Sequence, residues 1–506
     1  MTIPTNAPPG SRGDRGPLSR RRLLKGAVAA AAAWTIPGRS QSASRITVYV
    51  GSYTARGRGI YIYQMDTASG ALELMNVVTG EVNPSFLALD PHRRFLFAVN
   101  EIGNYEGRRS GSVSAFAVDA ATGNLTFLNR QPSEGASPAH ISVAPTGRYV
   151  LVANYTSGNV AVLPIEADGK LSPPTDVVNH SGPLGPNTAR QDAPHAHMIL
   201  TDPFGRFVLA NDLGLDRTFV YRLDQESGKL MANDPAFAVA EPGGGPRHLA
   251  FHPTGRYVYV LNELTSTLAA FAYDGARGTL QHLQTLRTLP GWYRGINTAA
   301  QVVVAPSGRF VYASNRGNDM VAIFAIDPDT GMMTLQDHLW VRGETPRNFN
   351  IDPTGNWMLV GNQNTDSITV FRIDQASGDL AFFGPMTAAG QPVCFLFSAP
   401  HAAGNTVRPG VTFWANPNPV EVTDRNGFGQ VTLSWNAPGT RELEIRIGAP
   451  DGASMGRINP YGSTTTGFWV TDGMTFYLQD VSESKPLTAA NTIGTARVEV
   501  RRPTPA

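Results

Sequence analysis

Arginine, glutamate and histidine side chains that could bind an anion or move a proton gather in one part of the chain. Arg247 and Glu263 belong to the stretch 243–263, which has the pattern of two short strands joined by the turn Pro253–Arg256. Because hairpin strands are antiparallel, the start of the first strand and the end of the second lie at one edge. The stretch therefore predicts, side by side, a cation that could stabilise an oxyanion and a carboxylate that could accept a proton.

This hairpin is one copy of a repeat that fills residues 46–400. The repeat begins with Pro-x-Gly-Arg-aromatic, has a small polar residue nine positions after the proline, and continues through a β-rich run to a Gly-x-Leu turn. The anchor prolines, two of them in weaker copies, are Pro91, Pro145, Pro203, Pro253, Pro306 and Pro353. Four strand-like runs per period, without an amphipathic helix, are typical of a propeller blade. A large β-sandwich is the alternative, but sandwiches do not repeat a motif this regularly.

The two ends of the repeat complete each other. Ile46–Ser52 has the pattern of a second strand without its first, and Pro392–Ser398 that of a first strand without its second. Together they predict a seventh blade that closes the ring and leaves no sheet edge exposed at its ends. We therefore expect residues 45–400 to be an all-β, seven-bladed propeller of four-stranded blades.

Two positions in each blade should meet near the axis on one face: the start of the first strand and the residue after the second strand. The first predicted ring contains Ser85, Ala139, His197, Arg247, Ala300, Arg347 and Val393. The second contains Tyr53, Glu101, Tyr155, Leu213, Glu263, Arg316 and Gln363. Five of these form one arc of chemically capable side chains, namely His197, Arg247, Glu263, Arg316 and Arg347. Departure from the repeat in neighbouring blades predicts a functional site there.

Other interpretations exist for these residues. Arg316 and Arg347 could be ordinary surface arginines, and Arg247 with Glu263 could be a salt bridge without a catalytic role. Glu101 stands apart from the arc in register and is expected to be structural.

The histidines outside the arc have their own alternatives. His195 and His197 could be half of a metal site with Asp212 and Asp216, but no further ligand is clear, so we predict neither a metal nor another cofactor. His248 and His252 lie within the hairpin and are expected to be structural.

The first 44 residues predict an export signal. Seven basic residues stand against the single acid Asp14, and the sequence Ser19–Lys25 precedes the weakly apolar run 26–36. This order is typical of a twin-arginine signal, and the run is too short for a stable membrane anchor. A disordered basic tail before a short helix is the alternative. We expect the protein to be periplasmic or extracellular.

Residues 406–506 lack the blade motif. Short alternating runs separated by Gly and Pro turns predict a small β-sandwich, immunoglobulin-like or fibronectin-like. We expect an accessory domain that binds a glycan or a protein, or adds stability. The net charge of +1, without a basic tract, does not indicate nucleic-acid binding, and the single Cys394 excludes an internal disulfide.

At the arc the sequence resembles the seven-bladed propeller lactonases, a family with the propeller-type 6-phosphogluconolactonases and, more distantly, the fungal carboxymuconate cyclases. The matching stretches are Tyr49–Thr54, Arg190–His197, Asp212–Arg217, Gly245–His248, Asn262–Glu263 and Ser314–Gly317. The resemblance implies that His197 (or His195), Arg247, Glu263 and Arg316 are the catalytic residues.

The resemblance also implies hydrolysis of a sugar lactone. In our hypothesis Arg247 and Arg316 hold an anionic group or the oxyanion, and Glu263 or His197 takes a proton from the attacking water. We assign substrate contacts to Arg190, His195, Asp212 and Arg347. Expected export favours an unphosphorylated aldonolactone or another anionic lactone. The alternatives are a lactonising cyclase, which is an intramolecular lyase, and a non-enzymatic binding propeller.

Overall fold

The computed structural model describes residues 45–398 except 92 and 204, and residues 407–501 except 409–410, 417, 419, 423–428, 438 and 467–469. These residues form β-strands and two short 3-10 turns, Ser482–Ser484 and Ala489–Asn491, and none of them is in an α-helix. The described residues accordingly include no helix of the length and apolarity that a membrane span requires. The expected twin-arginine signal lies outside the described residues.

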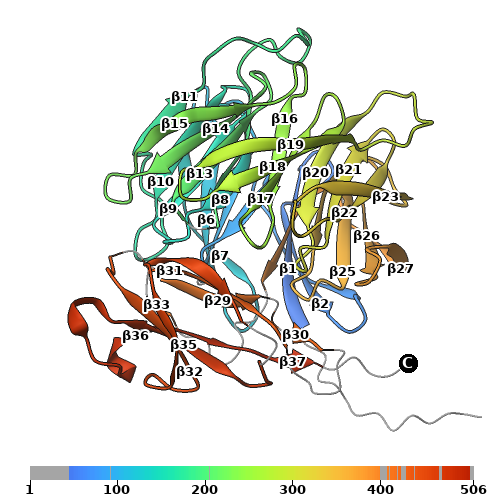
Figure 1. Cartoon of the computed structure of the whole chain (residues 1–506). Helices are drawn as coiled ribbons and strands as arrows, with labels where there is room; N and C mark the ends of the chain where they lie inside the picture. The colour runs from blue at the N-terminus through green and yellow to red at the C-terminus, as the bar shows by residue number, and fades with distance from the viewer. Residues whose placement is uncertain are drawn as a thin grey trace, which may run out of the picture. The chain divides into compact units, whose positions relative to one another are not determined.

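Strands β1 to β28 form seven four-stranded sheets, as the repeat predicts (Figure 1). The first sheet contains β28 (Pro392–Ser398), β1 (Arg45–Ser52), β2 (Ile60–Asp66) and β3 (Leu72–Val78). The second contains β4 (Leu87–Leu89), β5 (Phe95–Asn100), β6 (Ser112–Val118) and β7 (Leu125–Pro132). The third contains β8 (Pro138–Val143), β9 (Tyr149–Asn154), β10 (Asn159–Pro164) and β11 (Asp176–Asn179).

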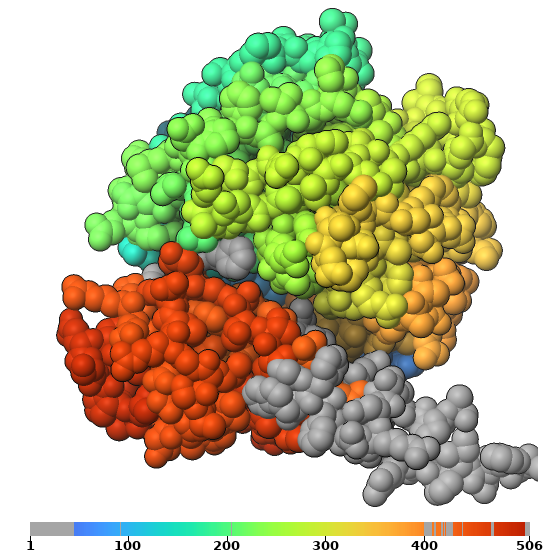
Figure 2. Space-filling model, in the orientation of Figure 1, coloured from blue at the N-terminus to red at the C-terminus, as the bar shows by residue number. Residues whose placement is uncertain are grey.

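The other four sheets follow in chain order around the ring (Figures 1 and 2). The fourth contains β12 (Ala196–Thr201), β13 (Phe207–Asp212), β14 (Arg217–Leu223) and β15 (Leu230–Val239). The fifth contains β16 (Pro246–Phe251), β17 (Tyr257–Asn262), β18 (Thr267–Asp274) and β19 (Thr279–Arg287). The sixth contains β20 (Thr298–Val304), β21 (Phe310–Arg316), β22 (Met320–Ile326) and β23 (Met333–Trp340). The seventh contains β24 (Pro346–Ile351), β25 (Trp357–Asn362), β26 (Ser367–Ile373) and β27 (Leu380–Ala388).

The ring is closed by both ends of the repeat. Strand β1 pairs antiparallel with β28, with Val48 opposite Phe397 and Val50 opposite Phe395. The predicted composite blade is therefore confirmed. Closure pairs the β1 edge that would otherwise remain open.

The second strand of each blade is largely apolar, and in β17 every residue is buried, so both faces of the strand are covered. In β17, Tyr257 and Tyr259 pack in a cluster with the sixth sheet, whereas Val258 and Val260 pack in a cluster with the fourth. Each blade thus packs against both neighbours, and this packing holds the strand starts of successive blades around a common axis.

The glycine of the repeat anchor occupies a left-handed backbone position. Gly147, Gly255 and Gly308 have φ of 70°, 69° and 71°, a region that costs other residues energy because of their Cβ atoms. Arg93, which replaces this glycine in the weaker second-sheet copy, adopts φ of 56°. The turn geometry is therefore kept where the glycine is lost.

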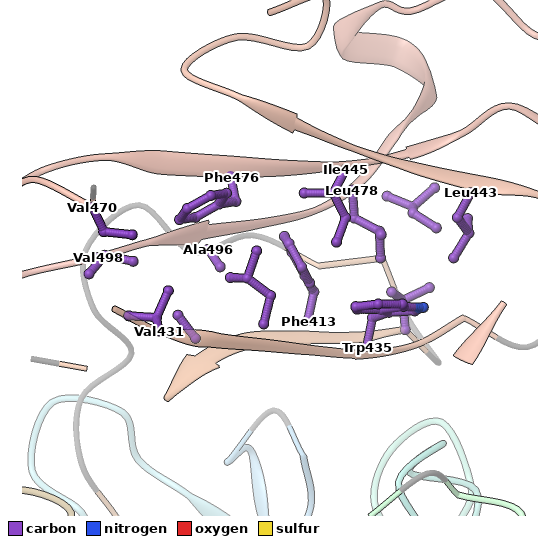
Figure 3. Close-up of a cluster of buried hydrophobic side chains, with 14 of the residues drawn as sticks. Phe413, Val431, Trp435, Leu443, Ile445, Val470, Phe476, Leu478, Ala496 and Val498 are labelled. Carbon is purple, nitrogen blue, oxygen red and sulfur yellow. The ribbon is translucent and has the colours of Figure 1, made fainter. Parts of the chain in front are cut away.

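The C-terminal region has three small sheets. One contains β29 (Thr412–Asn416), β31 (Thr432–Asn436) and β34 (Tyr461–Thr465), and a pair is formed by β30 (Val420–Glu421) and β37 (Val500–Arg501). The largest contains β33 (Ala453–Ile458), β32 (Leu443–Ile447), β35 (Thr475–Asp480) and β36 (Thr492–Arg497). Side chains such as Trp435 and Phe476, from different sheets, share one buried cluster (Figure 3). The immunoglobulin-like or fibronectin-like assignment stays a prediction.

Two glycine substitutions test the anchor turn. We expect Gly147→Ala to lower the free energy of unfolding by about 1 kcal/mol through φ alone, because the added Cβ would come no closer than 3.5 Å to a neighbouring atom. Gly308→Ala should cost more, because its Cβ would lie 2.6 Å from His252 Nε2. Urea unfolding measures both, with Gly103→Ala, at a position without neighbours within 4 Å, as the control. Equal stability of all three variants would contradict this account.

Candidate active site

The first predicted ring surrounds a pocket. Five of its seven members line this pocket, namely Ser85, Ala139, Arg247, Arg347 and Val393. Phe86, Glu101, His248 and Asn348 complete the lining. Of the remaining two ring members, Ala300 accepts a hydrogen bond from Arg247 through its carbonyl oxygen, and the ring of His197 lies 5.2 Å from that of His248. Residues at equivalent positions of the sequence repeat therefore do lie together in the structure.

In five blades, the residue at the first-ring position lies in a β-bulge. In β16 the pairing with β17 moves from Pro246 to His248, so Arg247 is the extra, unpaired residue. The same shift leaves Ala139, His197, Arg347 and Val393 unpaired in their strands. A bulge redirects a side chain without interrupting the strand. The bulges were not predicted from the sequence, although the Pro-x pattern at the strand starts accompanies them.

Glu263 lies at the centre of the arc and is 3% exposed. Its Oε2 is 2.8 Å from Arg247 Nε and 3.1 Å from Arg316 Nη2, and its Oε1 is 2.7 Å from Arg190 Nη2. Burial alone would raise the pKa of Glu263, but the three arginines outweigh it and lower that pKa to about 2. Glu263 is therefore an anion at neutral pH that orders three cations, and it is a weak base.

The arginines are fixed by backbone carbonyls as well as by Glu263. Arg247 is 2% exposed, and Arg316 donates hydrogen bonds to the carbonyl oxygens of Ala299, at 3.1 Å, and Thr298, at 3.4 Å. Arg190 also donates to Tyr155 Oη at 3.2 Å. Neither Arg316 nor Arg190 is an isolated surface cation.

Arg347 differs from the other three arginines. Its guanidinium lies over the Tyr53 ring, 5.2 Å from the centroid. Among the described residues, no hydrogen bond or ion pair to this guanidinium is found. Arg347 therefore presents a cation to the pocket that a bound anion could neutralise.

Glu101 lies on the pocket wall beside Arg347. Its Oε2 accepts a hydrogen bond of 2.8 Å from Tyr53 Oη, and it lines the pocket with Arg247. Glu101 was expected to be structural and apart from the arc in register, but in space it shares the pocket lining with Arg247 and Arg347. With four arginines and two glutamates, the site has a formal charge of +2.

His197 and His195 have different environments. His197 is 5% exposed, its Nδ1 has no hydrogen-bond partner, and burial together with nearby Arg247 holds its pKa well below the usual value. His195 is occupied by the protein: its ring nitrogens lie 3.0 Å from Asp192 Oδ1 and 3.1 Å from the Tyr155 carbonyl oxygen. The structure thus places His197, and not His195, at the bulge on the ring.

Asp212 does not face the pocket. Its carboxylate is fully buried, 2.7 Å from His180 Nδ1, and accepts hydrogen bonds from the backbone N–H groups of His195 and Leu215. Asp212 was predicted to contact substrate; its carboxylate instead has these protein partners, which hold the segment that contains His195, and it is not among the residues that line the pocket. Asp216, the other acid of the alternative metal interpretation, accepts hydrogen bonds from Gln191, Gly243 and Gly245.

Comparison with known proteins agrees with this geometry. The family model described as "Lactonase, 7-bladed beta-propeller" matches residues 47–397. The chain belongs to this family. It is 34% identical over 351 residues to a 6-phosphogluconolactonase of Bacillus subtilis, which covers 69% of this chain and 97% of that protein. It is also 33% identical over 311 residues to a 6-phosphogluconolactonase of Formosa agariphila, which covers 60% and 86% of the two chains.

A solved structure extends the comparison. The periplasmic gluconolactonase of Pseudomonas aeruginosa is 35% identical with a TM-score of 0.67, over 71% of this chain and all of that one. The resemblance to propeller lactonases is thus confirmed, and the predicted enzyme class, a lactone hydrolase, agrees with these relatives. The family match ends at residue 397, before the C-terminal sheets.

The charge cluster makes a prediction about stability. Glu263→Gln should lower the free energy of unfolding at pH 7 by about 3 kcal/mol, because it leaves buried arginines without their anion. The folded-state pKa of Glu263, about 2, lies below its ordinary 4.5, so its stabilisation is complete above pH 4.5 and is lost as pH falls toward 2.

Urea unfolding at pH 7 and pH 3 measures this effect. The difference between the wild type and Glu263→Gln should shrink at the lower pH. Glu226→Gln, at an exposed position, is the matched control and should stay within about 0.5 kcal/mol of the wild type. A difference that does not change with pH would contradict the assigned ionisation.

Proposed function

We propose that this propeller lactonase hydrolyses an aldonolactone in the pocket at the ring axis. The observation that carries the proposal is the buried Glu263 carboxylate, which holds Arg190, Arg247 and Arg316 around one point beside the pocket. Attack of water on a lactone carbonyl creates an oxyanion, and opening of the ring leaves a carboxylate. A site with a formal charge of +2 favours both anions over the neutral lactone.

The groups divide the chemistry between them. Arg247, which lines the pocket, stabilises the oxyanion. Arg316, which pairs with the same Glu263 oxygen as Arg247, adds its positive charge to this stabilisation. Glu263 orders the arginines and does not take the proton, because its pKa of about 2 makes it a weak base. The proton of the attacking water passes instead to a neutral histidine of the site, for which the sequence offered His197.

The substrate we favour is a sugar-type lactone without a phosphate. One relative is named a periplasmic gluconolactonase and others are named 6-phosphogluconolactonases. The expected export signal favours the former, since sugar phosphates belong to the cytoplasm. Binding of a glycan or a protein by the C-terminal region remains a proposal beside it.

A panel of lactones tests the activity. The protein without residues 1–44 should release acid from glucono-δ-lactone above the spontaneous rate, and Glu263→Gln should lower kcat/KM by about 100-fold or more by releasing the arginines. Glu226→Gln again serves as the control. Turnover without net addition of water would instead indicate a lactonising cyclase, and no turnover with retained partner binding would indicate a binding propeller.

Arg347 should determine the response to an anionic substituent. We expect Arg347→Met to raise KM for 6-phosphogluconolactone at least about tenfold more than KM for glucono-δ-lactone, because its guanidinium lies over the Tyr53 ring without a direct ion pair to a described carboxylate. Steady-state acid release on both substrates gives the two ratios. Equal changes would show that Arg347 does not contact the phosphate.

We also propose export through the twin-arginine route, supported by the pattern Ser19–Lys25 and by the periplasmic relative. The double variant Arg20→Lys, Arg21→Lys should remain in the cytoplasmic fraction. The wild type should instead be found in the periplasm or the medium. Cell fractionation and immunoblotting measure this. Unchanged export of the variant would exclude the route.

A further inference from the structure

The two histidines of the β16–β17 hairpin are built differently. His252 is satisfied at both ring nitrogens: Nδ1 lies 2.8 Å from Thr254 Oγ1, and Nε2 lies 2.9 Å from the Gly308 carbonyl oxygen. His248 hydrogen-bonds only through Nδ1, to Gln301 Oε1, and its Nε2 is buried without a partner. His252 is structural as predicted, whereas His248 also lines the pocket beside Arg247.

The tautomer of His248 follows from its partner. Gln301 donates its amide N–H to the Phe349 carbonyl oxygen at 3.4 Å, so its Oε1 faces the imidazole and can only accept. The proton of the neutral ring is therefore on Nδ1, and Nε2 carries a lone pair. Burial and the neighbouring Arg247 hold the pKa of His248 well below its usual value, which keeps the ring neutral.

Packed rings fix the orientation of this imidazole. His248 meets Phe86, His140 and His197 edge to face, with centroid distances of 5.8, 5.7 and 5.2 Å. The charged or titratable groups around it are Arg247, His140 and His197. The pKa of His140 is lowered to about 3 and that of His197 is also lowered, first by burial in each case, so Arg247 is the only permanent charge among the three.

We propose that His248, through Nε2, is the base that takes the proton from the water attacking the lactone carbonyl. The inference rests on the proposed function. The water oxygen bonds to the carbonyl carbon, the carbonyl π electrons move to the oxygen beside Arg247, and the water proton goes to Nε2. The ring C–O bond then breaks, and the same proton passes to the leaving ring oxygen. The hydroxy acid is formed and neutral His248 is regenerated.

His248 fits this role better than the two bases that the sequence suggested. Glu263 is saturated by three arginines. His197 packs its ring against Tyr155 and His248, and it does not contribute to the pocket lining that contains His248. Its Nδ1 has no hydrogen-bond partner among the described residues, so no neighbouring group sets its tautomer through that nitrogen.

The first experiment compares the two hairpin histidines. His248→Gln should lower kcat/KM for glucono-δ-lactone by about 100-fold or more, after subtraction of spontaneous hydrolysis. Calorimetric binding of the unreactive gluconolactam should change less than about threefold, because a base removed from the transition state leaves ground-state binding intact. His252→Gln is the matched control and should retain the wild-type kcat/KM.

The second experiment keeps His248 and changes its partner. Gln301→Glu places an anion on Nδ1, so the acid limb of the pH profile of kcat/KM should move upward by about one pH unit or more. Gln301→Leu should lower kcat, because the proton of His248 would no longer be held on Nδ1. These variants keep the inference testable where His248→Gln does not fold.

Three results would overturn the inference. Full activity of folded His248→Gln, or an unmoved pH profile in Gln301→Glu, would remove His248 as the base. Loss of lactam binding equal to the loss of activity would assign His248 to a substrate hydroxyl instead. Absence of lactone hydrolysis by the wild type would reject the proposed function itself, and is thus distinguished from failure of this inference alone.

Discussion

The buried ion cluster around Glu263 is the interaction on which the site depends. One carboxylate that is 3% exposed lies within 3.1 Å of three guanidinium groups from different segments of the ring. A buried charge is costly unless it is paired, so the carboxylate and the arginines stabilise one another. Each arginine can reach Glu263 only if its own blade is in place, which couples assembly of the ring to assembly of the pocket.

The repeat solves the problem of placing these groups. Seven similar sheets, closed by the pairing of β1 with β28, present equivalent strand starts around one axis. The bulge at the strand start leaves one residue unpaired in the sheet in five of the blades. That residue can therefore change between Ala139, His197, Arg247 and Arg347 without loss of the ladder that holds the blade. The residues that repeat between blades form the scaffold, and the residues that differ between blades form the site.

The low dielectric of this site also changes which residues can move protons. Glu263 gains so much from its arginines that it stays ionised, whereas the histidines near Arg247 stay neutral because a further buried cation would be unfavourable. The Glu263 carboxylate cannot itself stabilise a developing negative charge. It does hold in place the arginines that can stabilise that charge. Burial and Arg247 disfavour the charged form of these histidines, and a neutral histidine has a ring nitrogen that can accept a proton.

The sequence by itself determined the number of blades, their closure by both ends of the repeat, and the meeting of Arg247, Glu263 and Arg316, because a period-long pattern of turns and apolar runs fixes strand register. Tertiary structure decided what register could not: that Glu101 lies on the pocket wall, that Asp212 pairs with His180, and that His248 keeps a free nitrogen while His252 does not. These outcomes depend on partners far apart in sequence, such as Gln301 for His248, and on distances across the axis. A repeat pattern specifies where a backbone position lies, but the partner that saturates a buried polar atom is set only when the blades have packed.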